Sequence, residues 1–358
     1  MEKEKNNRSS FSGKIGFVLS AAGASVGLGN IWRFPYLAAK YGGGIFLLIY
    51  ILLALTFGYT MIVAESALGR MTRKSPVGAF KAFGKKAGWL SFGGWINAII
   101  PVLIVPYYSV IGGWVIKYFV EYLKGNGAKL AEDGYFSNFI SNGLSTEICF
   151  IVFCMFTLII IYAGVRNGIE RVSKFMMPIL VVLSVIIAIY SVTRPGALAG
   201  VKYFLVPNPK NFSWMTVVTA MGQMFYSLSI AMGILVTFGS YMKKDTSIED
   251  STRNVEVFDT AIAIMAGLMI IPAVFAFSGG DPDTLQAGPS LMFITIPKVF
   301  DSMGFGTFAG ILFFLLVLFA AVTSSIALTE SAVSTVEDEL KWSRKKSTVI
   351  VGFIMIIL

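Results

Sequence analysis

An apolar segment long enough to cross a bilayer is interrupted near its middle by the residues GASVGLGN, at positions 23–30. Gly23, Gly27 and Gly29 each weaken a helix by about 1 kcal/mol relative to alanine, and Pro35 follows them. A helix that faces lipid cannot tolerate an interrupted backbone, because the freed N–H and C=O groups find no water there. We therefore expect other helices to surround this span. Its free carbonyls suit a cation, and the N-terminal end of its second half suits a carboxylate.

The composition is that of a helical protein that crosses a membrane several times. Of 358 residues, 56% are hydrophobic and 14% are charged, whereas soluble domains contain about 25% charged residues. The net charge of +9 arises from basic residues that lie between the apolar runs, which favours a membrane protein over a nucleic-acid-binding one. The chain has no histidine, which excludes Ser-His-Asp and Cys-His catalysis. We expect neither an enzyme nor an organic cofactor.

Hydropathy predicts eight spans, at roughly 14–37, 43–69, 89–122, 146–163, 171–192, 214–241, 256–278 and 307–336. A ninth apolar segment, at 347–358, would rise only about 18 Å as a helix, so we expect the chain to end within its ninth span. Clusters of Lys and Arg precede the first span and follow the second, fourth, sixth and eighth. By parity all of them lie on one side, which predicts a multi-pass protein of the cell membrane with a cytoplasmic N-terminus.

The span at 214–241 is the second one with an interruption. Ser227 and Ser229 are able to bond backbone carbonyls, and Gly233 adds flexibility. Interrupted spans at the first position of two groups of five indicate an inverted-repeat transporter with a binding site at the membrane midplane. We therefore predict a single transporter domain over residues 1–358, with a first repeat at 14–192 and part of a second at 214–358.

Polar residues inside the later spans have two interpretations each. Thr323 and Ser324, in the run AAVTSS, either glue helices together or form a sodium site from hard oxygens, and the two interrupted spans favour sodium. Asp259 is either an acid at a helix start near the cytoplasmic interface or a buried acid that faces a cation. Glu65 is interpreted as a structural acid that pairs with a basic group, and Glu330 as an interfacial residue.

The motifs GLGNIWRFPY, YGGGIFLLIY and AESALGR, followed by TSS and then VEDEL, form an ordered and specific set. The chain resembles the neurotransmitter:sodium symporter family, in its LeuT-like bacterial branch, over nearly its whole length. The resemblance implies an all-α polytopic membrane protein with a LeuT-like inverted-repeat fold. In that fold the spans at 14–37 and 214–241 are unwound at mid-membrane, and here the second repeat is incomplete.

The resemblance also implies which residues bind ions and substrate. The first sodium site would contain Ser25, Asn30, Ser227 and Asp259, and the substrate carboxylate would complete it. The second would contain Gly23, Val26, Ala320, Thr323 and Ser324. The substrate would contact Ser25, Leu28, Gly29, Ile104, Tyr108, Tyr226, Ser227, Ser229, Met232, Ser324 and Leu328. Arg33 resembles the outer gate cation, and the inner gate would contain Arg8, Phe11, Ser240, Tyr241 and Asp338.

Four positions depart from the family's pattern. Asp259 stands where many relatives have Asn, and Ala263 where relatives carry a chloride-linked Ser or a Glu, so we expect chloride-independent transport. Ala231 replaces a glycine that is usual in the unwound segment. Met232 adapts its shape, which suits bulky aliphatic or aromatic substrates.

The expected function is sodium-coupled import of a neutral, hydrophobic or aromatic amino acid by alternating access. Its partners would be the amino acid, sodium ions and the lipid bilayer, without nucleic acid, and a homodimer is an open alternative. Two other functions stay open: a non-transporting fragment that only binds a ligand or a partner, and, less favoured, a cation channel.

Overall fold

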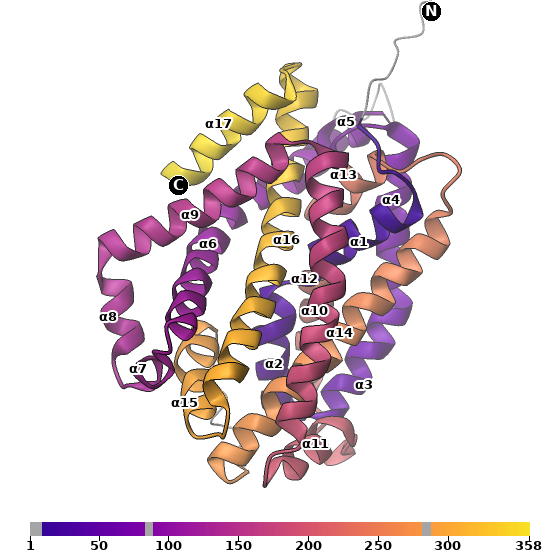
Figure 1. Cartoon of the computed structure of the whole chain (residues 1–358). Coiled ribbons are helices and arrows are strands. Elements are labelled where there is room, and N and C mark those ends of the chain that lie inside the picture. Colours follow the sequence, from indigo (N-terminus) through magenta and orange to yellow (C-terminus); the bar gives the residue numbers. More distant parts are fainter. Residues whose placement is uncertain (1–8, 83–88, 281–287) are drawn as a thin grey trace, which may run out of the picture.

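The structure is a computed structural model that describes residues 9–82, 89–280 and 288–358. The described residues form a bundle of helices, and Figure 1 shows the longest of them side by side. The α-helices in chain order are α1 Lys14–Ser25, α2 Phe34–Lys40, α3 Gly44–Leu53, α4 Tyr59–Thr72, α5 Pro76–Lys81, α6 Leu90–Leu123, α7 Gly127–Ala131, α8 Tyr135–Ser141, α9 Gly143–Tyr162, α10 Arg171–Val192, α11 Ala197–Leu205, α12 Trp214–Ser227, α13 Ile234–Ser240, α14 Ile248–Ser278, α15 Ile296–Asp301, α16 Gly306–Leu340 and α17 Arg344–Ile357.

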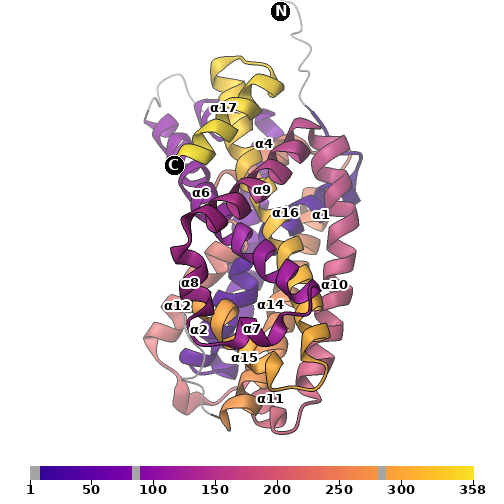
Figure 2. The same ribbon diagram turned by 60° about the vertical axis from the view of Figure 1, so that its left-hand side comes forward.

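Membrane-spanning helices dominate the fold. Within the described ranges, six helices are long and apolar enough to cross a bilayer: Gly44–Thr72, Leu90–Leu123, Gly143–Tyr162, Val165–Val192, Ile248–Ser278 and Gly306–Leu340. Lys14–Ser25 and Gly29–Lys40 pass the same test as a pair bent by 52°. Short helices, among them α7, α11 and α15, gather at one end of the bundle (Figure 2). This architecture confirms the prediction of an all-α polytopic membrane protein.

The first predicted interruption is present between α1 and α2. Helix α1 ends at Ser25, and Val26 takes an extended conformation with φ −74° and ψ 100°. A π-helical turn at Gly29–Arg33 then leads into α2. The bend leaves the backbone around Val26 outside the regular helical ladder, as the glycines of this segment predicted.

The second interruption separates α12 from α13. Every second residue from Ser229 to Gly233 lies in the left-handed region: Ser229, Ala231 and Gly233 have φ values of 55°, 61° and 68°. A right-handed helix cannot continue through such residues. The expected unwinding of the span at 214–241 is therefore confirmed.

The two interruptions lie inside the bundle. Helix α1 packs against α10, α14 and α16, while α16 also packs against α6 and α10. Val26, Leu28 and Asn30 are each at most 1% exposed. Burial by neighbouring helices is the condition under which a membrane protein keeps irregular backbone at this depth.

Helix α14 begins eight residues before the predicted start at residue 256. The Ser247 side chain caps it by accepting a hydrogen bond from the Asp250 N–H, and Glu249 and Asp250 lie in its first turn, where acidic residues are favourable. Asp259 is therefore about three turns into the helix and is fully buried. The alternative that places it at a helix start near the interface is wrong.

Helices α4 and α13 are in very close contact. A Cβ at Gly69 would lie 1.9 Å from the Val236 carbonyl oxygen, and one at Gly239 would lie 2.4 Å from the Ser66 carbonyl oxygen. Beyond this crossing, Arg73 donates to the carbonyls of Ser240 and Met242 at 2.9 and 2.5 Å. The arginine satisfies carbonyls at the C-terminal end of α13, which would otherwise have no helical partner.

Candidate functional site

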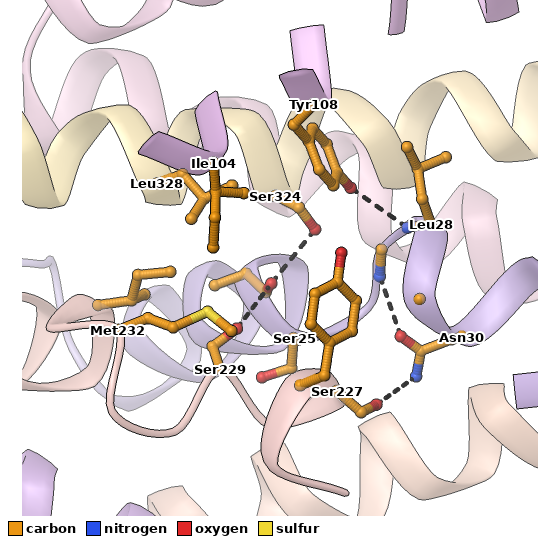
Figure 3. A pocket seen from close by; sticks show the side chains of 15 residues that line it. Ser25, Leu28, Asn30, Ile104, Tyr108, Ser227, Ser229, Met232, Ser324 and Leu328 are labelled. Carbon is orange, nitrogen blue, oxygen red and sulfur yellow. Dashed lines mark hydrogen bonds between the residues drawn. The ribbon is translucent and has the colours of Figure 1, made fainter. Parts of the chain in front are cut away.

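A small cavity lies between the two interruptions. Its volume is about 30 Å³, and it is lined by Ala24, Ser25, Gly27, Leu28, Gly29, Asn30, Ile104, Tyr108, Tyr226, Ser227, Ser229, Met232, Ile234, Ser324 and Leu328. Figure 3 shows that Ile104, Met232 and Leu328 group at one end of it, while Asn30 and Ser227 lie at the other. The cavity therefore has one apolar end and one polar end. All of the substrate-contacting residues expected from the sequence line it.

A buried carboxylate lies next to the polar end. Asn30 Nδ2 donates to Asp259 Oδ1 at 2.8 Å, and Ser227 Oγ lies 2.9 and 2.8 Å from the two carboxylate oxygens. Asn30 Nδ2 also donates to Ser227 Oγ at 2.9 Å. The structure thus brings together three of the four residues that the resemblance placed in a first sodium site, each from a different helical segment. The fourth, Ser25, lines the cavity.

Tyr50 is a member of this cluster that the sequence analysis missed. Its hydroxyl donates to Asp259 Oδ2 at 3.2 Å, and its side chain is fully buried. Tyr50 ends the motif YGGGIFLLIY, so its place in a specific motif was the available signal. An isolated buried carboxylate is costly, and three neutral donors reduce that cost without cancelling its charge.

Hydroxyls of α16 meet the interruption after α1. Ser324 Oγ lies 3.2 Å from each of the carbonyl oxygens of Gly23, Ala24 and Val26, so its hydrogen is shared among them. Thr323 packs against Gly23, where an added Cβ would be 3.1 Å from the Thr323 Cβ. A group of neutral oxygens therefore gathers here, which is the donor set that a hard cation prefers.

The Thr323 side chain is also bonded within α16. Its Oγ1 donates to the carbonyls of Phe319 and Ala320, at 2.9 and 3.2 Å. Of the five residues expected for a second sodium site, Gly23 and Val26 thus lie against Thr323 and Ser324, and Ala320 is one turn earlier on α16. Ala24 was not predicted, although its carbonyl also accepts a bond of 3.2 Å from Ser229 Oγ.

Backbone N–H groups at the start of the second half-helix point to the same cavity. The Leu28 N–H donates to the Tyr108 hydroxyl at 3.2 Å, and the Gly27 N–H donates to Asn30 Oδ1 at 3.1 Å. The glycines are required for space: a Cβ at Gly27 would lie 2.6 Å from Ser324 Oγ, and one at Gly29 would lie 2.4 Å from the Tyr226 ring. Such an arrangement is suited to an anionic group.

Arg33 lies beside Tyr226, which lines the cavity, and donates a hydrogen bond to a side-chain amide. Its Nη1 donates to Gln223 Oε1 at 2.7 Å, its guanidinium lies 5.3 Å from the centre of the Tyr226 ring, and Gln223 Nε2 donates to the Gly29 carbonyl at 3.1 Å. Within the part of the chain that the structure describes, no carboxylate forms an ion pair with Arg33. Gln223 is a further residue that the sequence analysis missed, because a single buried glutamine carries no motif.

On the opposite side of the cavity, the residues expected for an inner gate form a layer. The Phe11 ring packs edge-on against Phe238 and Tyr241, and its N–H donates to the Tyr241 carbonyl at 3.1 Å. The Ser240 hydroxyl donates to the Thr237 carbonyl at 2.6 Å, so Ser240 belongs to the same turn of α13.

Of the two charged residues expected at this gate, the structure describes Asp338, which lies near the end of α16. Asp338 accepts a bond of 2.6 Å from the Ser75 N–H. Arg8 lies outside the described residues, so its place in the inner gate stays a prediction.

Two acids differ from their expected surroundings. Glu330 was expected at the interface, but it is fully buried, where it pairs with Arg344 at 2.5 Å and accepts a bond of 2.6 Å from the Tyr241 hydroxyl. Glu65 was expected to pair with a basic group, but its carboxylate accepts a bond of 2.7 Å from the Ala231 N–H. Glu65 thus holds the unwound segment before α13, a role that only the backbone geometry makes visible.

The sequence matches the sodium:neurotransmitter symporter family over residues 8–130 and 137–358. It is 38% identical to YhdH, an uncharacterized sodium-dependent transporter of Bacillus subtilis, over 94% of this chain and 74% of the relative. An uncharacterized sodium-dependent transporter of Haemophilus influenzae is 33% identical over 98% and 78% of the two chains. The fold matches the crystal structure of MhsT in complex with L-phenylalanine with a TM-score of 0.88 and 36% identity, covering 98% of this chain and 79% of that one.

Proposed function

This chain belongs to the sodium:neurotransmitter symporter family, and on that premise we propose that it imports a neutral amino acid with a hydrophobic or aromatic side chain, coupled to sodium. The observation that carries the proposal is that oxygens surround one cavity between two interrupted helices. The Asp259 carboxylate bonds the lining residues Asn30 and Ser227, and α1 carbonyls accept from the lining residue Ser324. A carboxylate, hydroxyls and carbonyls are oxygen donors, and oxygen donors are the ligands of hard cations.

Two groups of oxygens support two sodium ions as co-substrates. In the first, Asp259 would supply charge, and Asn30, Ser227 and the Ser25 carbonyl would supply neutral oxygens. In the second, Thr323, Ser324 and the backbone of α1 and α16 would supply neutral oxygens only. Inward movement of each positive charge is favoured by about 2.3 kcal/mol per 100 mV of membrane potential. Such import requires a cytoplasmic N-terminus, which the distribution of Lys and Arg supports.

The amino acid would lie along the cavity with its charged groups toward the interruptions. The Leu28 and Gly29 N–H groups, with the Tyr108 hydroxyl, suit its carboxylate. The carbonyls between Tyr226 and Ser229 suit its ammonium group. The apolar end, made by Ile104, Met232 and Leu328, suits an aliphatic or aromatic side chain. L-phenylalanine in the MhsT complex supports this substrate class.

The described cavity is smaller than this substrate. A volume of about 30 Å³ has room for only one or two water-sized molecules. Substrate entry therefore requires side chains to move, and Met232 and Tyr226 are suited to do so because they border the cavity and are only partly buried. Alternating access then consists of two openings in turn. One separates the contacts of Arg33 with Gln223 and Tyr226, and the other separates the layer that contains Phe11 and Tyr241.

Chloride independence is the second part of the proposal. A fixed carboxylate at Asp259 supplies a negative charge next to the first group of oxygens, where a relative with a neutral residue needs a mobile anion. Asp259 is fully buried, so solvent ions do not screen its charge as they screen surface charges.

The test is uptake by proteoliposomes that contain the purified chain. We expect an inward sodium gradient to drive accumulation of labelled L-phenylalanine, competition by leucine but not by glycine, and unchanged uptake when gluconate replaces chloride. Competition by glycine and alanine alone would contradict the substrate class, and loss of most uptake without chloride would contradict chloride independence.

Two further measurements separate the remaining functions. Sodium-dependent binding without counterflow would identify a chain that binds but does not transport. Continuous single-channel current without substrate would identify a channel.

A further inference from the structure

A groove on the outside of the bundle, remote from the central cavity, runs between α10 and α16. Its volume is about 290 Å³. The floor is formed by Ile187 and Ala309, which are 2% and 4% exposed, and the walls include Ile186, Phe308 and Leu312. Figures 1 and 2 both show α10 and α16 side by side along this face. The groove is therefore an apolar trough whose walls face the surroundings of the bundle.

One end of the groove is closed by a tyrosine and carries a positive charge. The Tyr190 hydroxyl donates to the Gly304 carbonyl at 2.6 Å, which ties the end of α10 to the segment before α16. The Arg194 guanidinium stacks on the Tyr190 ring, 4.4 Å from its centre, and Arg194 Nε donates to the Tyr190 carbonyl at 3.1 Å. These contacts fix the guanidinium at the groove end.

Within the described residues, no acidic side chain neutralises the charge of Arg194. In the ranges 9–82, 89–280 and 288–358, no carboxylate lies within ion-pair distance of Arg194. Its contacts are the Tyr190 ring, a carbonyl and the Thr193 hydroxyl, none of which carries a formal charge. A guanidinium offers a planar fork of donors that matches the oxygens of a phosphate.

The groove end lies where the membrane meets water. Arg194 lies two residues after the end of the spanning helix Val165–Val192, and Tyr190 is of the residue type that concentrates at the headgroup level. Phe308 begins the apolar wall just inside the other helix, and its side chain is 60% exposed. An apolar trough that ends in a cation at this depth matches a molecule with an acyl chain and a phosphate.

We propose that this groove binds one anionic phospholipid, with an acyl chain on Ile187 and Ala309 and the headgroup phosphate on Arg194. The trough would recognise the chain by apolar contact, and the guanidinium would recognise the phosphate. The site is separate from the ion and substrate residues, so it does not depend on the proposed transport function.

The test is native mass spectrometry of the purified chain in detergent, titrated with phosphatidylglycerol or with diacylglycerol of the same chains. We expect one phosphatidylglycerol to bind more tightly than diacylglycerol. Arg194→Gln should weaken phosphatidylglycerol binding about tenfold, the effect of losing one charge-assisted hydrogen bond, and should leave diacylglycerol binding unchanged. Phe308→Ala, which alters an exposed side chain, should weaken binding of both lipids and keep their ratio.

Lys202→Gln is the matched control, because Lys202 is an exposed cation on the neighbouring helix α11. It should bind phosphatidylglycerol as the unaltered chain does. Equal loss in Lys202→Gln and Arg194→Gln would overturn the proposal, and so would equal binding of the two lipids. Competition by glycerol phosphate at the same concentration would show a free-anion site instead of a lipid site. If Arg194→Gln does not fold, Phe308→Ala still tests the proposal. Unchanged binding of both lipids by Phe308→Ala would then reject the groove as a lipid site.

Discussion

The side-chain amide of Asn30 donates a hydrogen bond of 2.8 Å to the carboxylate of Asp259, 229 residues later in the chain. The bond joins the interruption after α1 to the middle of α14. Because Ser227, the last residue of α12, also bonds both oxygens of this carboxylate, a single acid contacts both interrupted spans. A cation that binds to Asp259 would therefore act on the two interruptions together.

Replacement of Asp259 tests the charge at this junction. Asp259→Asn keeps the size of the side chain but removes its negative charge. We expect the apparent sodium affinity to fall by about tenfold or more, since a contact to a charged group contributes about 1.5–3 kcal/mol. The measurement is a sodium titration of L-phenylalanine binding to the purified chain.

Glu256→Gln is the control for this substitution. Glu256 is a buried acid on the same helix, about one turn earlier, and it bonds Thr260 at 3.3 Å. Its replacement should leave the sodium titration nearly unchanged. A similar shift in both variants would show that charge on α14 acts at long range and not through the cluster.

Replacement of Ser324 tests the second group of oxygens. Ser324→Ala removes the hydroxyl that lies 3.2 Å from three carbonyl oxygens of α1. A net loss of about 0.5–1.5 kcal/mol predicts a twofold to tenfold lower apparent sodium affinity. The neighbouring Ser325→Ala variant, which loses a contact of 3.3 Å to Thr157 instead, should keep the affinity. Equal effects would assign Ser324 to helix packing.

Replacement of Gly29 tests the close approach of Tyr226. The added methyl of Gly29→Ala would lie 2.4 and 2.6 Å from two ring carbons, so the ring must leave its position. Overpacking of this kind costs about 1–3 kcal/mol, and we expect substrate binding to weaken at least fivefold in a competition assay. Gly222→Ala on α12, where a methyl meets no atom within 4 Å, should bind substrate normally.

Ala231 carries backbone strain that glycine would relieve. At φ 61°, an alanine pays about 1–2 kcal/mol for the left-handed conformation, whereas glycine loses about 0.5–1 kcal/mol in entropy. Ala231→Gly should therefore raise the unfolding temperature slightly in detergent. Gly233→Ala, at φ 68° and with a methyl 2.6 Å from the Pro76 ring, should lower it clearly. A lower unfolding temperature for Ala231→Gly would show that strain is absent.

Local sequence features were sufficient to locate both interruptions. Gly23, Gly27 and Gly29 fall within seven residues, and this local density marked the first interruption without reference to distant residues. Single residues of these types are a weaker signal, since Gly267 and Ser325 lie within the regular helices α14 and α16. The depth of Asp259 was harder to predict, because it depends on where α14 begins, and a polar first turn capped by Ser247 hides that start from hydropathy. Boundaries of this kind are the least reliable part of prediction from sequence.

Pairings between distant residues could not be predicted in the same way. Glu330 is buried because Arg344, 14 residues later, folds back onto it after α16 has ended. Gln223 reaches the site because α12 packs against the turn at Gly29–Arg33, and Tyr50 reaches Asp259 from α3, which packs against α12. The family resemblance supplied most of the predicted site residues. Gln223 and Tyr50 were not among them, because neither was assigned a function when the motifs were compared.

The glycine contact between α4 and α13 has a mechanical consequence. Two backbones that touch at Gly69 and Gly239 leave no layer of side chains to slide over, so α13 cannot tilt without taking α4 along. Opening of the inner gate would then move α4 and α13 together as one unit. A spin label at Met71, which is 65% exposed on α4, would report that movement from a position that touches neither ion nor substrate.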